Sequence, residues 1–155
     1  MRYLVFHLGK DRYGLATHDL VRVLPLMELK TLPQAPDYVA GIMNLHGAPV
    51  PVIDLCSLAS GKPHTARYDT RILLVAYPDA SGTLHDLGLI AEGVAGFANI
   101  DADQLSDTGV SNPQAPYLGE VTAQDGKLLQ LVDLPLLLPA QIRDTLFVAA
   151  ERSVS

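Results

Sequence analysis

Histidines are the side chains of this sequence that could most readily hold a metal ion. The chain carries five, His7, His18, His46, His64 and His85. Strong metal motifs place their ligands three or four residues apart on a helix, or in short clusters, so that the imidazoles converge on one ion. No two of these histidines have such a spacing. We therefore expect no metal site.

Three other residues could in principle take part in catalysis, Cys56 as a nucleophile and Asp54 with Glu92 as an acid and a base. A lone cysteine at the end of an apolar strand is more often a small buried hydrophobe. Carboxylates that follow apolar strands commonly cap the next turn, and these two lie far apart in the sequence. The glycines in residues 88–96 lack the spacing of a nucleotide-binding loop. We expect neither a catalytic site nor a cofactor.

Short apolar runs between turn residues must position these side chains, and they predict an all-β fold. One helix is expected at Pro139–Ala150, because Leu138, Ile142, Leu146 and Ala149 have the spacing of one buried face. Asp125-Gly126 predicts a tight hairpin. The strands are expected at Tyr3–Leu8, Tyr13–Thr17, Leu20–Leu26, Gly41–Leu45, Val50–Leu55, Arg71–Tyr77, Leu84–Ala91, Leu118–Thr122 and Lys127–Leu134.

A polar, breaker-rich segment at Ser60–Thr65 predicts a boundary between two subdomains near residues 60–70. The strands before about residue 60 would form one small barrel and most later strands a second, tied together by an element that crosses between them. Residues 1–150 would thus form one domain, followed by a tail at residues 151–155.

The charge of the chain argues against two kinds of partner. The formal net charge is −6, from 11 basic and 17 acidic residues, and no cluster of Lys or Arg offers a footprint for nucleic acid or an anionic membrane. The sequence contains neither a signal peptide nor an apolar run long enough to span a bilayer. We expect a cytoplasmic protein that does not insert into the membrane.

Pro49 and Pro51 constrain the strand in which they lie. Proline cannot donate to a sheet ladder, so this strand must have an edge or a bulge at these positions. A rigid, apolar edge can bind a partner, but proline there can equally protect the edge from aggregation. Both interpretations are open on physical grounds.

The central stretch Gly41-Ile-Met-Asn-Leu-His-Gly-Ala-Pro-Val-Pro-Val-Ile-Asp-Leu55 resembles the signature motif of the CheW family of chemosensory coupling proteins. Similarity continues on both sides, from the opening strand at Tyr3–Phe6 to Leu128–Leu134. The resemblance implies two five-stranded, SH3-like β-barrels packed on a shared hydrophobic core, with a short C-terminal helix. It also implies a non-catalytic adaptor that joins the cytoplasmic hairpin tip of a methyl-accepting chemoreceptor to the regulatory domain of a CheA-type histidine kinase.

The same resemblance places receptor contacts on two strands of the first barrel but identifies no residue that contacts the kinase. His46 stands where the family usually has arginine, and Arg22 where many members have glutamate, so receptor choice is expected to differ. Alternatively, His46 is only a turn residue. The matching positions are Leu20, Arg22, Ile42, Asn44, Leu45 and His46.

Two finer expectations concern the signalling output and a different function. The residues Leu136–Phe147 and the lack of an N-terminal tail resemble adaptors of Wsp-type surface-sensing systems, in which the kinase feeds a diguanylate cyclase that makes cyclic-di-GMP. The alternative to an adaptor is a β-barrel that senses a small ligand in a cleft lined by residues Gly88–Phe97.

Overall fold

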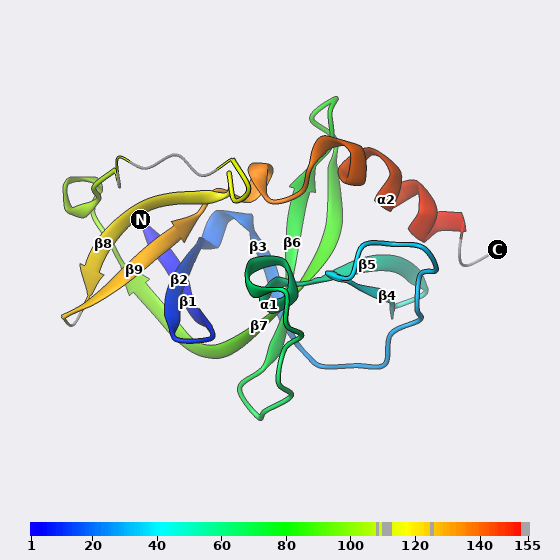
Figure 1. The fold of residues 1–155 in the computed structure, drawn as a ribbon, viewed down its shortest axis with the longest axis horizontal. Helices are drawn as coiled ribbons and strands as arrows, with labels where there is room; N and C mark the ends of the chain where they lie inside the picture. Colours follow the sequence, from blue (N-terminus) through cyan, green and yellow to red (C-terminus); the bar gives the residue numbers. More distant parts are fainter. Residues whose placement is uncertain (108, 110–112, 125, 153–155) are drawn as a thin grey trace.

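The structure is a computed structural model that describes residues 1–107, 109, 113–124 and 126–152. Strands dominate, and the longest helix is at the C-terminus (Figure 1). The elements in chain order are β1 (Arg2–Leu8), β2 (Asp11–Ala16), η1 (Thr17–Asp19), β3 (Leu20–Pro25), β4 (Val39–Leu45), β5 (Ala48–Asp54), α1 (Leu55–Ser60), β6 (Arg71–Pro78), β7 (Leu84–Asn99), η2 (Ala102–Gln104), β8 (Leu118–Gln124), β9 (Lys127–Val132), η3 (Leu134–Leu136) and α2 (Ala140–Arg152).

Strand β7 belongs to two sheets. Its first half pairs with β6 on one side and with β5 on the other, in what is here called the second sheet. In this sheet β3 pairs with β6, and β4 pairs with β5. Its second half pairs with β1, and β2, β9 and β8 complete the first sheet. β7 is therefore the crossing element that the sequence predicts without identifying. The sequence predicts that this strand ends at Ala91, which is where its pairing with β6 ends. The strand in fact continues to Asn99.

In the described part of the chain, one additional bridge closes each sheet on itself. In the second sheet, Lys30 pairs with Ile42, so the segment after β3 returns to β4. In the first sheet, Ser106 pairs with Val121, so the segment after η2 returns to β8. These closures give the two small barrels, and the predicted fold class is confirmed.

The division of strands between the barrels differs from the prediction. Strands before about residue 60 do not form one barrel, because β1 and β2 pair with β7 and β9 in the first sheet. The second sheet contains β3, β4, β5, β6 and the first half of β7. Short-range sequence signals carry no information on such distant pairing, which depends on which apolar faces fit together.

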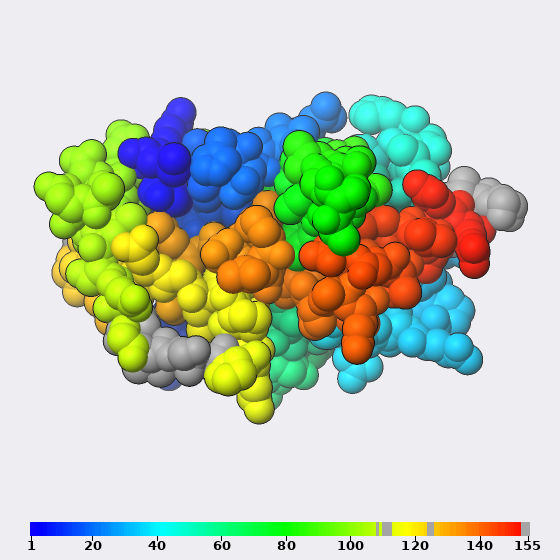
Figure 2. Space-filling view, turned by 90° about the horizontal axis from the view of Figure 1, so that it is seen from above, coloured from blue at the N-terminus to red at the C-terminus, as the bar shows by residue number. Residues whose placement is uncertain are grey.

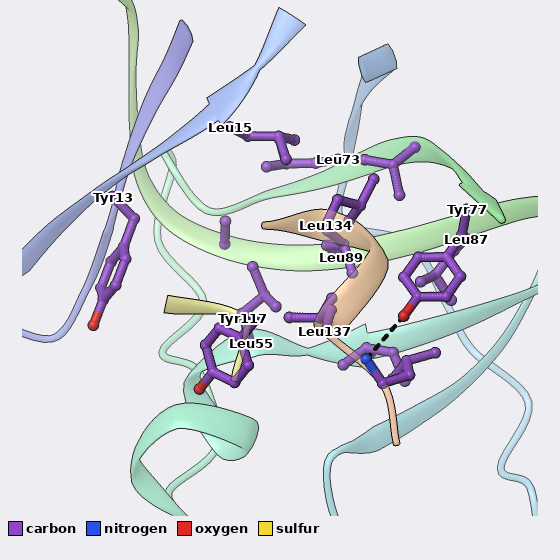
Figure 3. Close-up of a cluster of buried hydrophobic side chains, with 14 of the residues drawn as sticks. Tyr13, Leu15, Leu55, Leu73, Tyr77, Leu87, Leu89, Tyr117, Leu134 and Leu137 are labelled. Carbon is purple, nitrogen blue, oxygen red and sulfur yellow. Dashed lines mark hydrogen bonds between the residues drawn. The ribbon is translucent and has the colours of Figure 1, made fainter. Parts of the chain in front are cut away.

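A shared core joins the barrels. Tyr13 and Leu15 from the first sheet pack in one cluster with Leu73 and Leu89 from the second, and Leu137 from the segment after η3 belongs to the same cluster (Figure 3). Each barrel also has a smaller cluster of its own. At about 25 cal/mol for each Å² of apolar surface removed from water, burial of this kind is the main force that holds the barrels together.

Helix α2 covers the second barrel on the side of β5, and the tip of the β6–β7 hairpin lies against its first turns (Figures 1 and 2). The predicted helix is confirmed, but it runs to Arg152, so the expected tail begins later, and residues 153–155 lie outside the described residues. The predicted buried face is partly wrong, because Phe147 and Ala150 are buried and Ala149 only half-buried. Phe147 faces inward, where it joins the shared core and its ring stacks on His85, with centroids 4.4 Å apart.

Strands β8 and β9 form the predicted hairpin, with Gln124 opposite Lys127, and Asp125 lies outside the described residues. In the described part of the chain, no helix is long and apolar enough to cross a membrane.

Candidate functional site

The predicted receptor-contact residues fall into two groups on strands that are not neighbours. The second sheet has the strand order β3-β6-β7-β5-β4, so β3 and β4 lie at its two ends. The sheet closes between them through the bridge at Lys30, which follows β3 in the chain. Leu20 and Arg22 lie on β3, whereas Ile42, Asn44, Leu45 and His46 come together in the β4–β5 hairpin.

The tip of this hairpin is a two-residue turn that presents His46 to solvent. His46 and Gly47 have φ angles of 52° and 89°, as a turn with both central residues in the left-handed region requires. The side-chain Oδ1 of Asn44 accepts a hydrogen bond from the backbone N–H of Gly47 at 2.7 Å and holds the turn. Asn44 therefore has a structural role in the hairpin, and the exposed His46 is a turn residue whose imidazole is open to a partner.

The two apolar members of this group are less accessible than a docking anchor should be. Ile42 has an exposed fraction of 5%, and its backbone N–H and C=O both bond to Lys30. It lines the wall of a small hollow of about 110 Å³ beside Asn44 and Pro49. Leu45 is half-buried against the internal cluster of the second barrel. Both residues shape the hairpin, so Ile42→Asp would disturb the fold before it tested binding.

On β3, some of the residues that are accessible to a partner are absent from the predicted receptor-contact set. Leu20 is half-buried against the shared core, whereas Arg22 is exposed. On either side of Arg22, Val21 and Val23 have exposed fractions of 53% and 38%. The register of β3 against β6 shifts between Leu20 and Arg22, so exposure does not alternate here and Val21, Arg22 and Val23 are exposed in succession. Because the irregularity interrupts the alternation, the sequence of this strand carries no simple signal for the exposed pair.

A buried carboxylate organises the segment after β5. Oδ1 of Asp54 accepts bonds from the backbone N–H groups of Cys56 and Ser57, at 3.0 and 3.3 Å, and caps α1. Oδ2 lies 3.0 Å from the backbone nitrogen of His64 and 2.8 Å from its Nδ1. The capping interpretation of Asp54 is confirmed, and α1 is the helix that sequence reasoning missed.

Glu92 lies next to this group, although it is far from Asp54 in the sequence. Its Oε1 lies 3.1 Å from Sγ of Cys56, and its Oε2 accepts a bond from the backbone N–H of Thr65 at 3.0 Å. Burial acts to raise the pKa of Glu92, but hydrogen bonds from Cys56, Thr65 and Gly9 lower it overall. Glu92 lies inside β7 and does not cap a turn, so the capping interpretation is wrong for this residue.

The same contact decides the chemistry of the thiol. Burial, and then the hydrogen bond to Glu92, raise the pKa of Cys56 far above the usual range of a thiol. The thiol therefore stays protonated and donates to the carboxylate, and it is a poor nucleophile. Cys56 is buried in the first turn of α1, as the interpretation as a small core residue predicts.

The histidines are spread over the molecule. His7 contacts the carbonyl of Gly93 at 3.0 Å, and His64 and His85 each contact one aspartate. Among the described residues, no group of three or more His, Cys, Asp or Glu side chains gathers around a point where an ion could bind.

In the described part of the chain, the hollows at residues 30–33, 42–51 and 79–86 are not lined by residues 88–97, where a cleft for a small ligand was expected. At Gly88 a Cβ atom would lie only 3.0 to 3.3 Å from Ile72, Val52 and Met43, so the start of that segment is tightly packed. An open groove of about 670 Å³ lies instead between residues 30–33 and α2, with Leu32 and Val148 in its walls. The structure therefore gives no support to the predicted cleft.

Curated relatives share much of the chain. A chemotaxis protein CheW of Treponema pallidum is 33% identical over 144 residues, 84% of this chain and 78% of its own length. A chemotaxis protein CheW of Klebsiella aerogenes is 23% identical over 141 residues, 90% of this chain and 82% of its own length.

A solved structure has the same fold. The scaffolding protein TtCheW of Thermoanaerobacter tengcongensis superposes with a TM-score of 0.74 and 25% identity, covering 86% of this chain and 84% of that one. Its description as a scaffolding protein agrees with the expectation of a chain that works by binding and not by catalysis. The CheW-like domain family itself matches residues 2–141, and the chain therefore belongs to this family.

Proposed function

We propose that this chain is an adaptor that couples the cytoplasmic hairpin tip of a methyl-accepting chemoreceptor to the regulatory domain of a CheA-type histidine kinase. The observation that carries the proposal is the match to the CheW-like domain family over residues 2–141. The description of a solved relative as a scaffolding protein supports it. In this role residues 1–150 act as one domain whose two barrels share a core.

The receptor surface that we propose is the exposed part of the predicted set, the β4–β5 hairpin tip and Arg22. His46 and Arg22 are both exposed, and the turn holds His46 in a fixed backbone conformation. A fixed turn supports recognition because little conformational freedom is lost on binding. Ile42 and Leu45 shape the hairpin that presents this surface.

The test uses purified chain and a soluble receptor fragment that contains the hairpin tip. Asp and Asn both tolerate a positive φ, so His46→Asp adds a negative charge without changing the turn, and His46→Asn is the matched neutral control. We expect His46→Asp to weaken receptor binding by about tenfold, equivalent to about 1.4 kcal/mol, and His46→Asn to bind nearly as wild type, measured by calorimetry. Equal binding by wild type and His46→Asp would exclude the hairpin tip as the receptor surface.

The second part of the proposal, binding of the kinase, is tested with the same purified chain and receptor fragment. We expect the wild-type chain to bring the receptor fragment and the kinase into one complex in size-exclusion chromatography. A chain that binds neither would contradict the adaptor function.

We further propose that the output is of the Wsp type, in which the kinase controls a diguanylate cyclase. Removing the chain should then change the cyclic-di-GMP content of surface-grown cells and leave swimming intact. A swimming defect with unchanged cyclic-di-GMP would assign the chain to a flagellar system instead.

A further inference from the structure

The segment between α1 and β6, residues 61–70, is a loop that projects away from the two sheets, at the bottom of Figure 1. With Arg71 it carries three of the 11 basic residues, Lys62, Arg67 and Arg71, and only one of the 17 acidic ones, Asp69. The chain as a whole has a net charge of −6, so this loop, here called the basic loop, is a positive projection on a negative protein.

The basic loop is held in one shape from within. The side chain of Thr70, only 1% exposed, donates to the carbonyl of Thr65 at 2.8 Å and accepts a bond from the backbone N–H of Arg67 at 3.1 Å. The backbone N–H of Thr70 in turn donates to the carbonyl of Arg67. The loop therefore has an internal frame that does not depend on the side chains at its surface.

The loop is also fixed to the body of the protein. Thr65 and His64 donate their backbone N–H groups to the carboxylates of Glu92 and Asp54, both at 3.0 Å. These two carboxylates therefore accept hydrogen bonds from the inner side of the loop. Lys62 and Arg67 remain exposed on its outside, although Arg67 still lies close enough to Glu92 to help lower the pKa of that carboxyl.

Tyr68 stands at the outer end of this frame with an exposed fraction of 89%. The guanidinium of Arg71 donates to the backbone carbonyls of Tyr68 and Thr70, which fixes the backbone beneath the ring. Tyrosine and arginine are the types that most often supply binding energy in protein interfaces, and a fixed backbone reduces the entropy lost on binding.

We propose that the basic loop is a second docking surface, separate from the β4–β5 hairpin, and that it binds an acidic segment of a partner protein. Lys62 and Arg67 would contact carboxylates, and Tyr68 would pack against the apolar part of the same segment. The net negative charge of the remaining chain repels a long polyanion, so a short acidic protein segment fits better than nucleic acid. This surface goes beyond the proposed receptor contact and does not depend on it.

The test is an NMR titration of the whole chain with hexaglutamate at low salt. We expect shifts of the backbone amides of Lys62, Arg67 and Tyr68, which diminish as salt is added because surface ion pairs are screened. Arg67→Gln should weaken the binding by about threefold to fivefold, the effect of losing one exposed ion pair, and Lys62→Glu, which reverses the charge, should weaken it more. Lys127→Glu, at an exposed lysine on the β8–β9 hairpin, should leave it unchanged.

Two results would overturn the proposal. One is the absence of shifts in the basic loop, or shifts that Lys127→Glu reduces as much as Lys62→Glu does. The other is tighter binding of a DNA oligonucleotide of the same charge at the same residues, which would make phosphate the ligand. The receptor measurement with His46→Asp is separate, so each surface can fail while the other holds.

Discussion

At the scale of single residues, two carboxylates, the buried Asp54 and the partly buried Glu92, hold together segments that are distant in the sequence. Asp54 caps α1 and holds His64, and Glu92 contacts both Cys56 and Thr65. Polar groups of this kind are costly to bury unless every one is hydrogen-bonded, and among the described residues no buried side-chain oxygen or nitrogen lacks a partner. Residues with the types of a catalytic site thus have structural roles here.

Replacing Asp54 by alanine should destabilise the protein substantially. The substitution removes a helix cap and leaves the N–H groups of Cys56, Ser57 and His64 without this acceptor. We expect a loss of about 2 to 4 kcal/mol in the free energy of unfolding, from the cap and the buried donors together. Urea denaturation measures it, with Asp86→Ala on the exposed face of β7 as the control, and a loss no larger than that of the control would contradict this account.

The carboxyl of Asp79 should make the stability of the folded protein depend on pH in the acid range. Hydrogen bonds from the side chains of Ser81 and His85 lower the pKa of this carboxyl, and the N–H groups of Ser81 and Thr83 add to the effect. Because the folded pKa lies below the unfolded value of about 3.9, the contribution is present above that value and disappears as pH falls through the folded pKa.

We therefore expect the stability difference between wild type and Asp79→Asn to be constant above about pH 5 and to shrink below about pH 4. Urea midpoints at a series of pH values measure it. A difference that does not change between these pH values would show that the carboxylate contributes no such linkage.

At the scale of elements, α2 is attached to the second barrel by specific contacts as well as by burial. Phe147 stacks on His85. The hydroxyl of Tyr77 on β6 donates to the carbonyl of Pro135 in η3 and accepts from the N–H of Leu138, just before α2. The dashed line at Tyr77 in Figure 3 is the bond from Leu138. The helix lies along β5 near Pro49 and Pro51, whose strand pairs with β7 only from Val52 onward. The predicted free edge thus exists, and α2 lies beside it.

Tyr77→Phe tests the attachment of α2. Burial raises the pKa of the Tyr77 hydroxyl, so it stays protonated and can donate. Its removal leaves a buried N–H and a carbonyl without this partner, and we expect a loss of about 1 to 3 kcal/mol in unfolding free energy.

The matched control is Tyr68→Phe, the same chemical change on an exposed ring, which should cost less than about 0.5 kcal/mol. Thermal unfolding of both variants decides the point. Equal stability of the two variants would mean that the bridge to Leu138 contributes nothing.

At the scale of the whole molecule, the two barrels should unfold together, because β7 runs through both and one cluster spans them. The strand bends at Gly93, whose φ is +54° and whose position leaves a Cβ only 2.6 Å from Nδ1 of His7. Only glycine fits there without moving β1.

Gly93→Ala should therefore weaken both barrels at once. We expect a cost of about 2 to 4 kcal/mol from the strained φ and the clash, and a smaller one, about 1 to 2, from Gly96→Ala, which also has a positive φ but open space. In Gly93→Ala, the backbone amide hydrogens of β1 and β6 should exchange with solvent faster than in wild type, by the same factor in both strands. Faster exchange in β1 alone would show that the barrels unfold separately.

Much of the fold could be predicted from the sequence, because the signals involved are local. Apolar runs between turn residues placed the strands, Asp125-Gly126 placed a hairpin, and the spacing of residues 138–149 placed α2. The motif from Gly41 to Leu55 indicated the family. Each of these follows from backbone preferences or side-chain periodicity within a few residues, which is where sequence alone is informative.

Tertiary structure decided the rest, because it depends on contacts between distant segments. It assigned β1 and β2 to the barrel of β8 and β9, and it brought Glu92 to Cys56. It also buried Ile42 while leaving His46 exposed, a difference that a strand pattern cannot settle when the sheet closes on itself. The residues of the proposed receptor surface were named by sequence, but their accessibility was set by how the second barrel closes.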